Sequence, residues 1–353
     1  MAFFQCPKCK KKWQYPIEKC PQCFEDLIRM RPEKIKVIGV SKSTAPTLFH
    51  PFVPYFVLLL EDEKGNRWVQ KSQKEYKIGQ DFKITPASEK NAVAVWKIKY
   101  DILEGLEMVE KLISGIGNLT EKKKILILPS LTIPNHPHLR DNTSPEFLEA
   151  VLKFLIEKGA KTEKIKVASQ SFDEIPIEST AVKSQLVEIC QKFNITPLDL
   201  AKGDFLKKEK DGFNFEISKE IFDSDLIINL PILKIGKMSA SENILKLIKK
   251  ENYLGLKYLH PEEEILENLN KVLPNFLTLA EANYVQKPNK LVGFLGLILA
   301  SFNVLYLDRV FAEITLNTPE ELKKIEIKNI PIVGREIEEL KYGVGISIKL
   351  VRS

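Results

Sequence analysis

Alternating apolar and polar positions, broken by turn residues, dominate the chain between residues 35 and 95. The apolar runs that predict β-strands cover residues 35–40, 55–61, 67–71 and 82–85. Glu63, Lys64, Gly65 and Asn66 separate the second run from the third and are typical of a hairpin turn. Short strands joined by such turns predict a small β-barrel of the OB-fold type, to which we assign residues 31–96.

From about residue 97 the pattern changes to helices that alternate with short buried strands. The predicted strands are residues 124–128, 164–168 and 226–230, and the predicted helices are residues 101–114, 146–158 and 178–193. Ser144 and Pro145 form a start signal for the second helix, and Gly159 stops it. Residues 203–218 are polar and indicate a hairpin or a loop. This alternation predicts an α/β domain with a mainly parallel sheet, to which we assign residues 97–353.

Four of the five cysteines lie within the first 23 residues, as two C-x2-C pairs separated by ten residues. They are Cys6, Cys9, Cys20 and Cys23. Each pair can form a tight knuckle whose two thiolates point at one ion, and four thiolates complete a tetrahedral site with no open position. The spacing predicts a structural zinc ribbon over residues 1–30, because so short and polar a segment cannot build a core without a metal. Iron in a rubredoxin-like site would use the same ligands.

Composition narrows the class of protein without identifying a ligand. Apolar residues make up 44% of the 353 residues and charged residues 28%, which is typical of globular domains and excludes a largely disordered chain. The formal charge of +6 is too small to indicate nucleic-acid binding by itself. The first residues lack a signal-peptide pattern, and the longest apolar stretch, residues 291–307, is interrupted by Gly, Ser and Asn. We therefore expect a cytoplasmic protein that does not cross a membrane.

Residues 1–95 resemble a family of zinc-ribbon/OB-fold proteins called domain of unknown function 35. The resemblance rests on the two C-P-x-C knuckles, on residues 38–44 (IGVSKST), on residues 51–60 and on residues 62–68. Proteins of this family accompany thiolase-like enzymes and are thought to bind the CoA part of acyl-CoA, or to bridge a thiolase to a partner. The resemblance implies CoA or acyl-CoA as a ligand and a thiolase-like or other acyl-CoA enzyme as a partner.

Residues 98–353 resemble a second family, domain of unknown function 362, through stretches that are spread along the chain. These stretches are residues 124–131 (KILILPSL), 142–145, 225–234 (DLIINLPILK), 255–260 and 296–308. They follow one another in the order that the family shows. The resemblance implies an α/β domain without an assigned activity.

Aromatic side chains of the predicted barrel form one candidate binding surface. Phe49, Phe52 and Tyr55 gather around Pro51 and Pro54. Exposed aromatic rings on an OB-fold face can stack on bases or on an adenine ring, so these three residues are candidates for contact with CoA or with a partner. A plain role in anchoring the core or a loop is the alternative.

Histidines in the α/β domain form a second group of candidates. Ligands of open α/β sheets bind beyond the carboxyl ends of the strands. His136, His138 and Asp141 lie in a loop that follows the strand at residues 124–128 and also holds an arginine, so this loop could bind a metal or an anion. His260, which precedes an acidic helix start, could join the other two histidines.

Two further residues are candidates for catalysis. Lys234 ends a predicted buried strand, where its ammonium group could meet a phosphate or a carboxylate. Glu281 follows another apolar segment and is a candidate acid. The glycine-rich motifs of dinucleotide-binding, P-loop and serine-hydrolase proteins do not occur in the sequence, so these classes have little support.

These observations favour an accessory or scaffold protein of acyl-CoA metabolism. Its ribbon and barrel would bind CoA or dock a thiolase-like acyl-condensing enzyme, and its α/β domain would carry an unassigned activity. One alternative is a metal- or anion-dependent enzyme that uses the α/β domain. The other is a nucleic-acid-binding zinc-ribbon/OB protein, against which the scarcity of arginine and the modest charge count.

Overall fold

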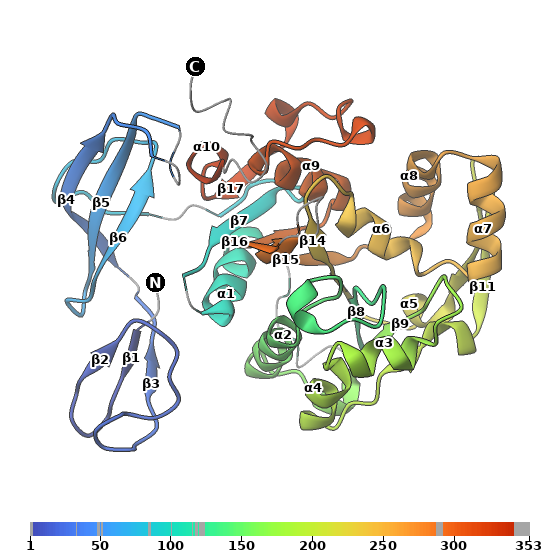
Figure 1. Ribbon diagram of the computed structural model, residues 1–353, viewed down its shortest axis with the longest axis horizontal. Coiled ribbons are helices and arrows are strands. Elements are labelled where there is room, and N and C mark those ends of the chain that lie inside the picture. Colours follow the sequence, from blue (N-terminus) through green and yellow to red (C-terminus); the bar gives the residue numbers. More distant parts are fainter. Residues whose placement is uncertain are drawn as a thin grey trace.

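The computed structural model describes residues 3–32, 34–47, 50, 52–83, 86–99, 101–114, 116, 119, 124–286 and 292–341. Two small N-terminal sheets lie beside a larger α/β domain (Figure 1). None of the described helices combines the length and the apolar character that a membrane crossing requires.

The cysteine-rich segment folds as a three-stranded antiparallel sheet in the order β2-β1-β3. Its strands are β1 (Phe3–Gln5), β2 (Lys12–Trp13) and β3 (Ile28–Met30). Phe3 and Met30 pack with Val37, Leu58 and Trp68 of the following sheet in one buried cluster. The first sheet therefore shares its small core with the second.

The second sheet is also antiparallel and has the order β4-β5-β6. Its strands are β4 (Ile35–Ser43), β5 (Tyr55–Asp62) and β6 (Arg67–Ser72). The Asp62 carboxylate accepts hydrogen bonds from the backbone N–H groups of Lys64 (2.9 Å) and Asn66 (2.8 Å), which confirms the predicted hairpin turn. The predicted strand at residues 82–85 is wrong in its described part, because Phe82 and Lys83 lie outside any strand. A closed OB barrel therefore stays a prediction.

In the α/β domain the described residues form a nine-stranded sheet in the order β10-β9-β8-β13-β15-β16-β7-β17, with β14 paired to β15. The strands are β7 (Val93–Lys97), β8 (Ile125–Pro129), β9 (Ile165–Ser169), β10 (Leu198–Asp199), β13 (Leu226–Leu230), β14 (Ile232–Lys234), β15 (Leu277–Gln286), β16 (Val292–Ser301) and β17 (Ile332–Gly334). Only β16 runs against its neighbours, so the mainly parallel sheet is confirmed. The predicted barrel limit at residue 96 falls inside β7, which belongs to this sheet.

Helices cover both faces of the large sheet. One face carries α1 (Ile102–Ile113), α2 (Pro145–Glu157), α3 (Ile177–Lys183) and α4 (Leu186–Lys192), and the other carries α6 (Ser239–Leu245), α7 (Lys250–Leu259), α8 (Glu262–Val272) and α9 (Val304–Ile314). In β8, Ile125 and Ile127 belong to the core on the face that α1 to α4 cover. Leu126 and Leu128 belong to the core on the face that α6 to α9 cover. A strand buried on both faces must be apolar at every position, which is the pattern of residues 124–128.

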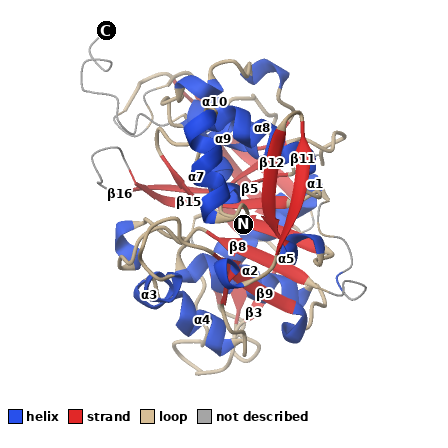
Figure 2. Ribbon diagram, turned by 90° about the vertical axis from the view of Figure 1, so that its right-hand side faces the viewer, coloured by secondary structure: helices blue, strands red, loops and turns tan. Residues whose placement is uncertain are grey.

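Two predicted elements lie outside the strands of the large sheet: one differs from its prediction and the other is confirmed. The predicted helix at residues 178–193 is two helices, because Gln185 between α3 and α4 has a φ of 61° and interrupts the helical backbone. The predicted excursion at residues 203–218 is the hairpin of β11 (Phe205–Lys210) and β12 (Phe213–Ser218), which Figure 2 shows at the surface. The remaining α-helices of the described residues are two short ones, α5 (Lys219–Phe222) and α10 (Ile337–Leu340).

Gly105 lets α1 lie directly on the sheet. A Cβ atom there would lie 2.5 Å from Cγ2 of Ile98 and 2.6 Å from Cδ1 of Ile298. We expect Gly105→Ala to lower the free energy of unfolding by about 1–3 kcal/mol, because the packed core must shift to admit the methyl group. Gly255→Ala is the matched control, since a Cβ at this position in α7 meets nothing within 4 Å. The control should gain about 0.5–1 kcal/mol in urea denaturation. Equal changes in both variants would contradict the close packing of α1.

Candidate functional sites

The four cysteines predicted as metal ligands meet in the N-terminal sheet. Their sulfur atoms all lie within 4.8 Å of one another, and the Sγ atoms of Cys9 and Cys20 are 3.7 Å apart. Cys6 and Cys20 are fully buried, whereas Cys9 and Cys23 are partly exposed. A tetrahedral ion with bonds of about 2.3 Å would place its sulfur ligands about 3.8 Å apart, so these residues fit a zinc ion.

Two matching backbone turns place the four sulfur atoms. The N–H of Lys10 donates to the carbonyl of Cys6 (3.1 Å), and the N–H of Phe24 donates to the carbonyl of Cys20 (2.9 Å). Lys10 and Phe24 both have positive φ, 61° and 58°. The two knuckles thus have one geometry, and together they can hold a metal such as zinc with every coordination position filled by sulfur. A metal bound in this way supports structure and leaves no position for a substrate.

The three candidate histidines do not come together with a carboxylate in a second metal site. His136 and His138 are exposed on the short 3-10 helix Pro137–Leu139, with ring centroids 4.6 Å apart. His260 ends α7 and packs against the ring of Phe213, 4.3 Å between centroids. Among the described residues, the four cysteines form the only group of three or more metal-ligating side chains. The hypothesis that the loop at residues 135–141 binds a metal therefore has no support from the described residues.

The other three candidates of the α/β domain lie at the carboxyl edge of the large sheet. β15 runs on beyond the last residues of β13, so Glu281 stands past the ends of the central strands. Both carboxylate oxygens of Glu281 accept a hydrogen bond from the hydroxyl of Ser144, at 2.8 and 2.7 Å. The Nζ atom of Lys234 lies 3.6 Å from Oδ1 of Asp141. The sequence indicated Ser144 as a helix cap, but its contact with Glu281 joins residues too distant for a local pattern to reveal.

Of the aromatic candidates in the N-terminal module, which consists of the β1–β3 and β4–β6 sheets, the two that the structure describes do not form an exposed stacking surface. Tyr55 is buried, and the ammonium of Lys71 lies over its ring, 4.6 Å from the centroid. Phe52 is partly buried and lines a separate hollow with Pro54 and Phe56. Phe49 lies outside the described residues. The described rings therefore serve chiefly as anchors, which was the alternative use of this cluster.

Ion pairs join the N-terminal module to the α/β domain and leave a cleft between them. Arg29 of β3 donates to Asp101 (2.9 Å) and Glu107 (2.7 Å) at the start of α1. On the other side of the cleft, Arg335 donates to the backbone carbonyl of Lys71 in β6 (2.9 Å). The cysteine-rich sheet is thus attached to the α/β domain through Arg29, and the β4-β5-β6 sheet through the hydrogen bond from Arg335.

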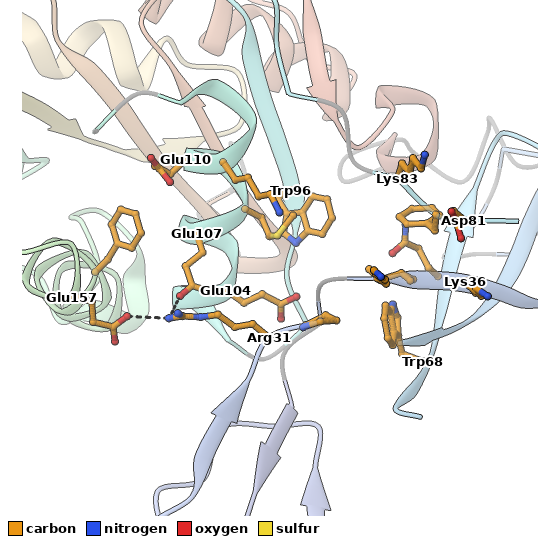
Figure 3. A pocket seen from close by; sticks show the side chains of 18 of the residues that line it. Arg31, Lys36, Trp68, Asp81, Lys83, Trp96, Glu104, Glu107, Glu110 and Glu157 are labelled. Carbon is orange, nitrogen blue, oxygen red and sulfur yellow. Dashed lines mark hydrogen bonds and ion pairs between the residues drawn. The ribbon is translucent and has the colours of Figure 1, made fainter. Parts of the chain in front are cut away.

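The larger half of the cleft has a volume of about 850 Å³. Figure 3 shows Trp68 and Lys36 on the wall from the β4-β5-β6 sheet, and Trp96, Glu104 and Glu107 on the opposite wall. Apolar side chains of Ile35, Met108 and Phe154 line the same space. The larger half is therefore an amphipathic cavity within the size range of small-molecule sites.

The smaller half, about 560 Å³, shares Trp68, Gln70, Trp96 and Glu104 with the larger one and is rich in cations. Its basic lining residues are Lys71, Lys97, Lys99, Arg335 and Lys341, and its only acidic ones are Glu104 and Glu339. The Arg335 guanidinium is neutralised by Glu339. Lys97 is exposed to the solvent of the cleft, and its side chain forms neither a hydrogen bond nor an ion pair in the described part of the chain. Desolvation in the cleft lowers the pKa of Lys97, and the charges of Arg335 and Lys71 lower it further.

Comparison with known proteins places the α/β domain in a family. The family model described as "Domain of unknown function (DUF362)" matches residues 125–313. A thylakoid-associated protein of Synechocystis is 29% identical over 135 residues, which are 38% of this chain and 40% of that protein. A solved structure, the Ltp2-ChsH2(DUF35) aldolase, is matched with 22% identity over 29% of this chain and 76% of that chain, at a TM-score of 0.20. Because the family match spans more than half of its length, the chain belongs to the DUF362 family.

Proposed function

We propose that this chain is a binding protein of acyl-CoA metabolism that holds a phosphorylated, ring-bearing ligand of the coenzyme A class in the cleft between its N-terminal module and its α/β domain. The observation that carries the proposal is the unpaired ammonium of Lys97 in the cation-rich half of the cleft. The resemblance of residues 1–95 to the thiolase-associated family supports the choice of ligand class.

The charges of the smaller half favour a ligand with phosphate groups. Glu339 neutralises Arg335, but no carboxylate within 4.0 Å neutralises Lys71 or Lys97 in the described part of the chain. Desolvation lowers the pKa of both Lys71 and Lys97, and the charge of Arg335 lowers both further, against the opposing charge of Glu339. An anion that enters beside these lysines would offset both the repulsion and the lost hydration. A phosphate group supplies that charge.

The aromatic and apolar walls favour the remaining parts of such a ligand. Phe294 is 47% exposed at the edge of the smaller half, so part of this aromatic residue is open to contact with a ligand ring. Trp96 lines both halves of the cleft, and in the larger half Met108 and Phe154 add apolar contact surface. A ligand with a phosphorylated ring system at one end and a long, weakly polar arm at the other would use both halves.

Lys97→Met should weaken CoA binding by about tenfold or more, because a charge-assisted hydrogen bond to phosphate is lost while the apolar stem is kept. Isothermal titration of the full chain with CoA measures the change. Lys183→Met is the matched control, since Lys183 is exposed on α3 away from the cleft. Absence of CoA binding by the unmodified chain, or equal affinity of the two variants, would refute the proposal.

Two further arms separate the rival functions. A single-stranded oligonucleotide that binds more tightly than CoA, with a strong salt dependence, would favour the nucleic-acid alternative. Co-purification with a thiolase-like or other acyl-CoA enzyme is the expected sign of a carrier that passes its ligand to a catalyst. The metal-dependent enzyme is the less favoured alternative, because His136 and His138 are exposed and His260 packs elsewhere, against Phe213.

A further inference from the structure

Arg140 is a largely buried arginine whose guanidinium makes no hydrogen bond in the described part of the chain. Its side chain is 11% exposed, and its nearest carboxylate oxygens, on Glu146 and Glu281, are each 3.9 Å away. Those separations exceed hydrogen-bond length. The guanidinium nitrogens of Arg140 are not among the buried side-chain atoms that lack a partner, so solvent reaches donors that no acceptor of the described chain occupies.

Comparison with the chain's other buried arginines sharpens this point. Arg29 donates to two carboxylates, Arg309 donates to Glu313 and to a backbone carbonyl, and Arg335 donates to Glu339 and to a backbone carbonyl. Their side chains are 16%, 11% and 9% exposed. Arg140 is buried to the same degree without such partners. The fold therefore gives Arg29, Arg309 and Arg335 direct hydrogen-bond acceptors, whereas the Arg140 guanidinium has two carboxylates at 3.9 Å and no hydrogen bond in the described part of the chain.

We propose that Arg140 binds the carboxylate or phosphate group of a small-molecule ligand at the carboxyl edge of the large sheet. The guanidinium presents two parallel N–H groups that match an oxyanion in a bidentate fashion. The site is separate from the cleft and goes beyond the proposed function. It lies where open α/β sheets bind their ligands, just past the ends of β8 and β13.

The surroundings of Arg140 hold it in place and keep it accessible. The guanidinium carbon lies over the ring of Tyr284, 4.8 Å from the centroid, and that ring is 38% exposed. Glu146 on the other side is exposed as well. The loop that carries Arg140 is fixed to β15 by Gln286, whose amide donates to the carbonyl of Leu139 (2.9 Å) and to Asp141 (3.1 Å). A solute can therefore reach Arg140 while the backbone stays fixed.

Glu281 places a buried carboxyl group 3.9 Å from the Arg140 guanidinium. Burial raises the pKa of Glu281 to about 7, against the opposing hydrogen bonds of Ser144 and the charge of Arg140, and Glu146 adds to the rise. In its protonated form the carboxyl group no longer repels an anion on Arg140 and no longer competes with it for the charge of the guanidinium. The affinity for sulfate, whose charge is constant between about pH 6 and about pH 8, should rise as the pH falls, and Glu281→Gln should abolish that dependence.

Thermal unfolding of the full chain in two anions tests the proposal. Sulfate stands for a phosphate group and succinate for a carboxylate, with chloride at equal ionic strength as the reference. The melting temperature of the unmodified chain should rise in at least one of the two, and which one acts identifies the ligand group. Arg140→Met should lose the rise, and Arg140→Lys should keep only part of it. Arg67→Met, an exposed arginine of β6 paired with Glu61, controls for the general salting effect of these anions.

The same experiment distinguishes a ligand site from a structural role. Because Arg140 has no hydrogen bonds to lose and its two carboxylate neighbours are 3.9 Å away, Arg140→Met in chloride should melt close to the temperature of the unmodified chain. A markedly lower melting temperature in chloride would assign Arg140 to the structure and overturn the proposal. Equal anion responses of Arg140→Met and the unmodified chain, or no response of the unmodified chain, would overturn it too.

Discussion

Replacement of Cys20 by serine is expected to remove the metal from the N-terminal sheet and to unfold residues 3–30. Cys20 is fully buried, and its sulfur faces that of Cys9 at 3.7 Å. Three strands of two or three residues cannot hold themselves together, and only Phe3 and Met30 of this segment join the shared cluster. Binding of a structural zinc is worth about 10–16 kcal/mol in small domains, so its loss removes the main support of the segment.

Metal analysis and hydrogen exchange measure this outcome. The unmodified chain should carry one zinc per chain, and Cys20→Ser none, with fast amide exchange over β1 to β3 and protection retained in β8 and β13. A chelator should have the same effect. Cys190→Ala is the control, because Cys190 is buried in α4 and belongs to no ligand group among the described residues. One metal ion retained by Cys20→Ser would contradict the four-cysteine site.

Among substitutions that remove one polar side chain of the α/β domain, the replacement of Asp308 by alanine is expected to be the most destabilising. Asp308 is fully buried on α9, and its carboxylate accepts hydrogen bonds from the N–H groups of Ala240 (3.1 Å) and Ser241 (2.8 Å). These groups belong to the first turn of α6, which has no side-chain cap of its own. Asp308→Ala leaves both donors buried without an acceptor, at a cost of about 3 kcal/mol or more.

Asp308 also predicts a dependence of stability on pH. Burial raises the pKa of Asp308 from 3.8 to about 7, although the hydrogen bonds from Ser241 and Ala240 oppose the rise. The folded state then keeps a proton that the unfolded state has already lost, so the free energy of unfolding falls as the pH rises from about 4 to about 7. Below about pH 4 both states hold the proton, and above about pH 7 neither does, so the curve is flat on each side.

Urea denaturation across this range separates the Asp308 contribution from others. The pKa of Glu281 is also raised to about 7, so Glu281 makes the free energy of unfolding fall with pH in the same way. The quantity to compare is therefore the difference in the free energy of unfolding between the unmodified chain and Asp308→Asn. The asparagine keeps one acceptor and cannot titrate, and its curve should be less steep. Identical slopes would show that Asp308 keeps its charge at low pH in the folded state.

Local signals in the sequence account for the parts of the fold that were predicted. The cysteine spacing needs only two knuckles, each closed within five residues, so it could be recognised without the rest of the chain. The predicted helix start at Ser144 is confirmed, since its hydroxyl caps α2 by accepting from the N–H of Phe147 (3.2 Å). Strands β8 and β13 were visible because burial on both faces demands continuous apolar residues.

Non-local packing explains what the sequence did not reveal. Residues 93–97 have the same apolar character whether they end a small barrel or enter a large sheet, and only their pairing with β16 and β17 decides between the two. The cleft is formed by residues as distant as Lys71 and Arg335, which no spacing rule connects. Arg140 was part of the loop expected to bind a metal or an anion, but its lack of partners is visible only once the burial of its neighbours is known.

The position of β7 has a consequence for synthesis of the chain on the ribosome. β7 lies between β16 and β17, two strands that are translated long after it. Until they emerge, the nascent chain exposes an apolar strand with two unpaired edges, which is a site where chaperones bind and aggregation begins. The cysteine-rich sheet and the β4-β5-β6 sheet are complete before β7 is made, so both can fold early and the four cysteines can bind metal, while the α/β domain must wait for nearly the whole chain.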